Sequence, residues 1–94
     1  MDLINKNILD DYKKKHSDSV KPLANWERLV HLAQWKAPQD IKNAIRSADF
    51  LSGNRVIFNI GGNKHRLLVV VAYTKEKMIV RWIGTHAEYS KKKF

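Results

Sequence analysis

The sequence contains no cysteine, and this absence excludes several kinds of site at once. Without cysteine there is no disulfide framework, no thiolate nucleophile and no cysteine-ligated zinc. A long hydrophobic run is also missing, since the longest one, Leu67 to Tyr73, falls far short of the roughly 20 residues that span a bilayer. The opening stretch MDLINKNILDD lacks the apolar region of a signal peptide. We therefore expect a soluble, cytoplasmic protein with no membrane contact.

Acidic residues are scarce relative to basic ones. The 94 residues include 18 Lys or Arg but only 9 Asp or Glu, which gives a formal charge of +9. Residues 48–94 carry nine basic and three acidic side chains, net +6, against net +3 for residues 1–47. A surplus of this size predicts a polyanionic partner that is contacted mainly by the C-terminal half. The length predicts one domain over residues 1–94.

Hydrophobic periodicity predicts helices in the first half of the chain. Residues 2–16 carry one apolar helical face, and the first few of them alternatively form a short edge strand. Ser17-Asp18-Ser19 offers N-cap side chains for a second helix, which we expect to end at Lys36-Ala37-Pro38. Pro38 then opens a short third helix through Ile45.

From Asp49 onward the pattern becomes that of strands, at residues 55–60, 66–73 and 78–83, with Gly84 ending the last strand. The tail THAEYSKKKF forms a helical turn or lies over the sheet. This order of elements predicts an α+β fold, in which N-terminal helices pack on one face of a small, mainly antiparallel sheet.

The register of the second hairpin predicts which side chains share a face. If its turn is centred on Lys75-Glu76, Val70 faces Arg81, and both Arg66 and Arg81 lie on the same face. The opposite face is then wholly apolar, and we expect the helices to cover it. Its predicted members are Leu67, Val69, Val71, Met78, Val80 and Trp82, while Leu68, Ile79 and Ile83 lie on the arginine face.

The turn at Gly61-Gly62 decides the faces of the first hairpin. A two- or four-residue turn places Asn59 and Lys64 with Arg66, and it adds Val56, Phe58 and Ile60 to the apolar face. A three-residue turn reverses this arrangement. We prefer the even turn because it keeps the helix-covered face apolar.

Two arginines on one face, followed by His86 and Tyr89, suit the cleavage of RNA by its own 2′-hydroxyl group. This reaction needs a base, cations at the phosphate and an acid for the leaving 5′ oxygen, and it requires no metal. Arg66 and Arg81 match the phosphate role, because a guanidinium binds phosphate with a planar fork. His86 suits proton transfer, and Tyr89 suits stacking on a base or proton transfer. Further RNA contacts are predicted at Lys64, His65, Asn63, Lys91 and Lys92.

Each of these residues also has an ordinary structural interpretation. His86 can cap the end of a strand, and Tyr89 can be a packing residue. Lys91–Lys93 is most often a solvated tail. Four scattered histidines lack the spacing of a metal site, so neither a metal nor a cofactor is expected.

Two stretches in this order resemble the HigB-type toxins, which belong to the RelE-like superfamily of bacterial toxin–antitoxin modules. They are FNIGGNKHRL (Phe58–Leu67) and, after an apolar strand, VRWIGTHAEY (Val80–Tyr89). Trp26 with its helix, PQDIKNAIRSADFL (Pro38–Leu51) and the chain length fit as well. The resemblance implies a RelE-like microbial RNase fold and a metal-independent mRNA interferase that acts in translating ribosomes. It also implies a HigA-type helix-turn-helix antitoxin as partner, through which alone the toxin contacts DNA.

Position by position, the resemblance places Arg66, Arg81, His86 and Tyr89 on the active face. The chain departs from the family pattern where it has His65 in place of tyrosine, and Ser90 in place of aspartate, so Ser90 receives no acid–base role. Two other functions stay open. A non-catalytic RNA-binding module binds RNA in a salt-sensitive way without cleaving it. A DNA-binding component on the antitoxin side needs a recognition helix, although the helices are not the most basic elements of this chain.

Overall fold

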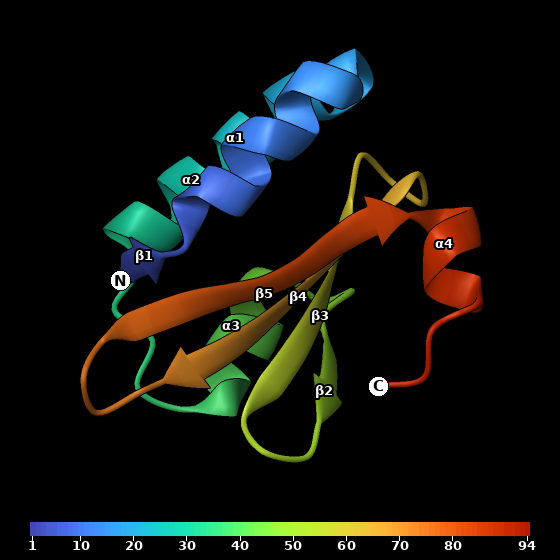
Figure 1. Ribbon diagram of the computed structural model, residues 1–94. Helices are drawn as coiled ribbons and strands as arrows, with labels where there is room; N and C mark the ends of the chain where they lie inside the picture. Colours follow the sequence, from blue (N-terminus) through green and yellow to red (C-terminus); the bar gives the residue numbers. More distant parts are fainter.

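The structure, a computed structural model, describes residues 1–94 and contains one five-stranded sheet with its helices. The strand order is β1-β5-β4-β3-β2, in which β1 runs parallel to β5 and every other neighbouring pair is antiparallel. This arrangement confirms the predicted α+β class (Figure 1). The elements are β1 (Asp2–Ile4), α1 (Lys6–Lys15), a 3₁₀ turn η1 (Ser17–Ser19), α2 (Val20–Leu32), α3 (Pro38–Ala44), β2 (Asp49–Leu51), β3 (Arg55–Ile60), β4 (His65–Ala72), β5 (Lys77–Thr85) and α4 (His86–Ser90).

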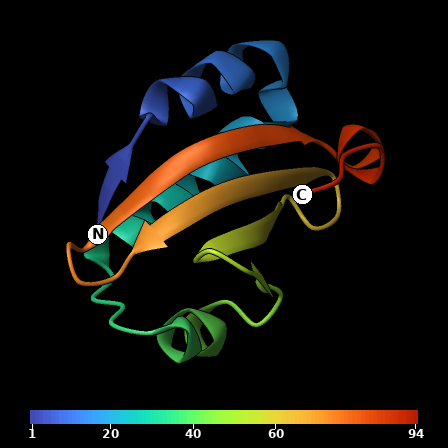
Figure 2. The same ribbon diagram turned by 60° about the horizontal axis from the view of Figure 1, so that its bottom comes forward.

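One hydrophobic core lies between the sheet and the three longer helices. Each helix contributes buried side chains to it, among them Leu9 of α1, Trp26 of α2 and Ile41 of α3. In Figure 2, α1 runs alongside β5, and α3 lies near the opposite edge of the sheet, by β2 and β3. None of the helices combines the length and the hydropathy that crossing a membrane requires. The core-facing residues of the central strands are Val56, Phe58, Ile60, Leu67, Val69, Val71, Met78 and Val80.

The first residues form the edge strand that was one of two predicted alternatives, and α2 ends earlier than predicted. Residues 2–4 form an edge strand beside β5, and Asn5, at φ 65°, turns the chain into α1. Helix α2 ends at Leu32, so the predicted end at residues 36–38 was wrong. The Met1 amino group donates hydrogen bonds to the carbonyls of Val30 and Ala33, both at 2.9 Å, and thereby satisfies groups that a helix end leaves without partners.

The first hairpin has the four-residue turn that was preferred. Ile60 pairs with His65 and Asn59 with Arg66, so the turn consists of residues 61–64. Gly61 and Gly62 adopt φ values of 65° and 70°, a left-handed conformation that glycine tolerates best. Asn59 and Arg66 consequently lie on the face that the helices leave uncovered, which we call the open face.

The second hairpin differs from the predicted register. Val70 pairs with Ile79 rather than with Arg81, because the loop comprises residues 73–76. A β-bulge then makes Arg81 the extra residue of β5, since Val69 pairs with Val80 but Leu68 pairs with Trp82.

An extra residue in one strand reverses the alternation of side chains beyond it. Trp82 therefore lies on the open face and Ile83 packs against the core, so the predicted faces of both residues were wrong. Strand β5 also continues through Gly84 to Thr85, so Gly84 does not end it.

Candidate functional site

The open face consists of three rows of paired side chains that cross strands β3, β4 and β5. The row nearest α4 contains no side chain at Gly84. A Cβ atom at this position would lie 2.4 Å from Cζ2 of Trp82, so only glycine leaves room for the indole ring. From the far end toward α4, the rows are Arg55–Val70–Ile79, Ile57–Leu68–Trp82 and Asn59–Arg66–Gly84.

Arg66 is an almost buried cation, with 8% of its surface exposed. Its Nη1 donates to the carbonyl oxygens of Asn63 and His65, at 3.1 and 3.2 Å, and its Nη2 donates to Oδ1 of Asn63 at 3.3 Å. All three acceptors are neutral, and no carboxylate forms an ion pair with this guanidinium. A buried charge is stabilised by an opposite charge, so the site lacks an anion beside Arg66.

The other cations on and around the open face also lack carboxylate partners. All six ion pairs of the molecule involve other residues, most of them in or beside α1 and α2. The carboxylates of these ion pairs, Asp10, Asp18, Glu27 and Glu76, neutralise none of the cations of the open face, which favours an anionic ligand there. The cations without a carboxylate partner include Arg55, Lys64, Arg66, Arg81, Lys91, Lys92 and Lys93.

Helix α4 is fixed against the glycine turn by its first residue. The backbone N–H of His86 donates to the carbonyl of Lys64 at 2.9 Å, so the two sequence stretches meet here. Thr85 and Glu88 form a capping box, in which the backbone N–H of each residue donates to the side chain of the other, at 2.8 and 3.2 Å. The hydrogen bond from the Thr85 backbone holds the pKa of Glu88 below its usual range. Glu88 therefore stays a carboxylate that holds the cap.

Tyr89 lies under the guanidinium of Arg66. The Cζ atom of Arg66 is 5.7 Å from the centre of the phenol ring, within the range of a cation–π interaction. Tyr89 is half-buried, whereas His86 and Lys64 are exposed to solvent. The structure thus brings together Arg66, Tyr89, His86 and Lys64, and Asn63 joins them as a hydrogen-bond acceptor for Arg66.

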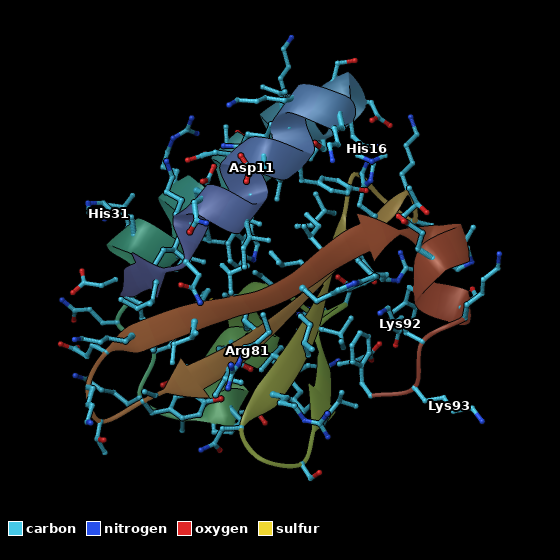
Figure 3. All side chains as sticks on the ribbon, in the orientation of Figure 1. Asp11, His16, His31, Arg81, Lys92 and Lys93 are labelled. Atoms are coloured by element: carbon cyan, nitrogen blue, oxygen red, sulfur yellow. The ribbon has the colours of Figure 1, made fainter.

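The remaining predicted contacts lie further from this group. Arg81 is exposed at the bulge, and Figure 3 places it near the middle of the sheet, apart from Lys92 beside α4. Lys91 and Lys92 are exposed on the segment that follows α4, and Nζ of Lys92 is 5.8 Å from the centre of the Trp82 ring. These residues flank the Arg66–Tyr89 pair.

His65 lies on the helix-covered side of the sheet, where only 2% of its surface is exposed. Its Nδ1 is 2.6 Å from the hydroxyl of Tyr12, and its Nε2 is 3.3 Å from Oδ2 of Asp18. The ring of His16 stacks on Tyr12 at a centroid distance of 4.1 Å (Figure 3 labels His16 at the end of α1). This predicted RNA contact therefore joins α1 and η1 to β4 and does not face the open side. No group of three or more acidic or histidine side chains is placed to hold a metal ion.

Burial of the Tyr12 phenol, with a smaller effect of the Glu88 charge, raises its pKa to about 12. The phenol therefore stays neutral throughout the physiological pH range and keeps its hydroxyl proton in the 2.6 Å contact with Nδ1 of His65.

A Tyr12→Phe variant tests this network by its alkaline stability. Above pH 10 the phenol of the unfolded chain ionises while the folded one stays protonated up to about pH 12. The folded state then binds the extra proton, so the contribution of Tyr12 to the free energy of unfolding falls as the pH rises through this window. Urea unfolding at several pH values measures the free energy of unfolding of both proteins. The excess of the wild type over Tyr12→Phe should shrink above pH 10. An advantage that stays constant to pH 11.5 would contradict the assigned network.

Two aromatic residues of this face were missed by sequence reasoning. The ring of Phe94 lies 5.4 Å from that of Trp82 and 6.0 Å from that of Tyr89. Strict alternation along the strand predicts Trp82 on the apolar face. No pattern in the sequence predicts the β-bulge at Arg81, which places Trp82 on the open face instead. One feature of the sequence could have pointed to a packing role for Phe94, because it is the only apolar residue after Tyr89.

The fold and this face define a small, basic α+β protein that offers cations and stacked aromatic rings to an anionic polymer. Residues 19–92 match the family model of the HigB toxin, described as the RelE-like toxic component of a toxin–antitoxin system. The protein therefore belongs to the HigB toxin family.

Curated relatives agree with this assignment along nearly the whole chain. An mRNA interferase toxin HigB of Escherichia coli strain K12 is 28% identical over 91 residues, which cover 95% of this chain and 88% of that protein. An mRNA interferase HigB of Shigella flexneri shows the same identity and coverage. Another, from Escherichia coli O6:H1 strain CFT073, is 24% identical over 93 residues, or 97% of this chain and 90% of that protein.

Proposed function

We propose that this toxin is an mRNA interferase, an endoribonuclease that cuts messenger RNA at the open face. The observation that carries the proposal is the guanidinium of Arg66, which is almost buried, lacks a carboxylate partner and lies over the ring of Tyr89. A phosphate provides the missing negative charge, and the base next to it can stack on an aromatic ring. The printed names of the relatives, mRNA interferase HigB, support the same activity.

In the proposed reaction, the 2′ oxygen of the message attacks the neighbouring phosphorus and the bond from phosphorus to the 5′ oxygen breaks. The products are a 2′,3′-cyclic phosphate and a free 5′-hydroxyl. Arg66 stabilises the charge that develops on the phosphate. His86 and Tyr89 transfer the two protons, one taken from the 2′-hydroxyl and one given to the leaving oxygen.

Neighbouring phosphates bind the flanking cations in this proposal. Arg81 at the bulge contacts the strand of RNA further along β5, and Lys64, Asn63, Lys91 and Lys92 contact it near α4. His65 is left out of the proposed site, because it is buried against Tyr12 and Asp18 on the other side of the sheet.

We further propose that the toxin cuts messages in translating ribosomes in the cytoplasm and acts as a single domain. Its charge of +9 favours association with ribosomal RNA as well as with the message. A HigA-type helix-turn-helix antitoxin is the proposed partner, and DNA is contacted only through that partner.

Reconstituted translation of one defined message tests this function. With ribosomes present, the wild-type toxin should cut the message within its coding region, and without ribosomes the message should stay intact. RNA that is bound but never cut, even on ribosomes, would support the non-catalytic RNA-binding module instead. A shift of operator DNA by the toxin alone would support the DNA-binding component.

A further inference from the structure

The segment that follows α4 turns back toward the strands (Figure 1). It places the ring of Phe94 beside Trp82 of the open face. The ring of Phe94 lies between Trp82 and Tyr89, at centroid distances of 5.4 and 6.0 Å. Its plane is within 28° of the Tyr89 plane but tilted by 59° from that of Trp82. Phe94 is therefore stacked on Tyr89 and packs at a tilt against Trp82, so that the three rings form one aromatic cluster with Phe94 at its centre.

No hydrogen bond holds Phe94 in this aromatic cluster. The amides of Lys91 and Lys92 bond to carbonyls of α4, at 3.2 and 3.0 Å, whereas Lys93 and Phe94 make no hydrogen bond. The side chain of Phe94 also stays 38% exposed, so it is only partly desolvated. A ring held this weakly can be displaced by a ligand that stacks better.

A cation lies over each of the two outer rings of this cluster, Trp82 and Tyr89. Nζ of Lys92 is 5.8 Å from the centre of the Trp82 ring, and Cζ of Arg66 is 5.7 Å from that of Tyr89. The phenyl ring of Phe94 between Trp82 and Tyr89 is uncharged, so it gives Lys92 and Arg66 no anionic partner. A nucleobase is equally flat, and the phosphates attached to its sugar would bring negative charge to both cations.

We propose that Trp82 and Tyr89 form a slot for one unpaired nucleobase of the RNA substrate, and that Phe94 fills this slot in the free protein. The inference rests on the proposed function and specifies its substrate as a base that is unstacked from its neighbours. Phe94 then competes with RNA, whereas Trp82 supports RNA binding. Replacing the two residues must consequently change RNA affinity in opposite directions.

Binding to a short single-stranded RNA, made uncleavable by 2′-O-methyl groups, measures both effects by fluorescence anisotropy. Phe94→Ala should bind this RNA several-fold to about tenfold more tightly, because the slot no longer has an internal occupant. Trp82→Leu should bind about tenfold more weakly, and Trp82→Phe should recover part of the loss. The matched control is Phe50→Ala on β2, where the phenylalanine is 39% exposed and the variant should bind like the wild type.

An RNA series in which one nucleotide at a time is abasic locates the stacked base. At one position, the abasic RNA should bind wild type and Trp82→Leu equally. The proposal is overturned if Phe94→Ala binds no more tightly than Phe50→Ala, or if Trp82→Leu loses the same factor at every abasic position. Thermal unfolding checks that the variants are folded, and if Trp82→Leu is not, Phe94→Ala and Trp82→Phe still decide the outcome.

The slot and the proposed function fail in different ways. If the wild type neither binds this RNA nor cuts messages on ribosomes, the proposed function falls, and the slot with it. If the wild type binds and cuts but Phe94→Ala matches the control, the slot alone is wrong and Phe94 is an ordinary packing residue.

Discussion

An Arg66→Lys variant should cut ribosome-bound messages roughly a hundredfold more slowly than the wild type, in line with the loss of one preorganised donor at a reacting oxyanion. Lysine keeps the positive charge but loses the planar fork that contacts two phosphate oxygens. It also loses the cation–π contact with Tyr89, which in the wild type holds the guanidinium over the phenol ring at 5.7 Å. Single-turnover cleavage on programmed ribosomes measures the effect.

Arg66 also bonds to the glycine turn, so a loss of activity needs a structural control. Arg55→Lys provides one, because Arg55 lies on the same face and also bonds to its own turn, through the carbonyl of Ser52 at 2.8 Å. This variant should cut at the wild-type rate, and both variants should keep cooperative thermal unfolding. A folded Arg66→Lys protein that cuts as fast as the wild type would remove Arg66 from the reaction.

The double variant His86→Ala, Tyr89→Ala should no longer arrest bacterial growth when its expression is induced. General acid–base catalysis contributes roughly 10²–10⁴-fold per group, so the loss of both proton-transfer candidates should leave too little cleavage to stop translation. Growth curves and the integrity of a reporter message measure the outcome. Both positions lie on one surface helix outside the core cluster, so the fold should persist.

Two further variants sharpen this result. His31→Ala with Tyr73→Phe changes a histidine and a tyrosine elsewhere in the molecule and should leave toxicity intact. Tyr89→Phe keeps the ring under Arg66 but removes the hydroxyl, so it separates stacking from proton transfer. If the folded double variant stays as toxic as the wild type, neither His86 nor Tyr89 carries the reaction.

Much of the fold could be predicted because local patterns and burial agree along most of the chain. The stripe formed by Leu23, Trp26 and Val30 is buried as expected, and the even glycine turn follows from the need to keep one sheet face apolar. The same reasoning placed Arg66 on the open face. The hydrogen bond from His86 to Lys64 then joins the two stretches that carry the family resemblance.

The rest of the candidate site depends on features that a residue pattern does not encode. The bulge at Arg81 changes the pairing by one residue, and it moves Trp82 to the open face. The length of the glycine turn determines which face of the sheet the His65 side chain lies on. Its contacts with Tyr12 and Asp18 are visible only in the folded structure. The position of Phe94 depends on how the segment after α4 folds back, which no periodicity describes.

The most direct test of the central claim is the chemistry of the ends that the toxin leaves on a message cut during translation. Attack by the 2′-hydroxyl predicts a 2′,3′-cyclic phosphate on the upstream fragment and a 5′-hydroxyl on the downstream one. It also predicts that a single 2′-deoxynucleotide at the cut position abolishes cleavage there, while the same change several nucleotides away has no effect. A 3′-hydroxyl with a 5′-phosphate, or undiminished cleavage at the deoxynucleotide, would contradict the proposed reaction.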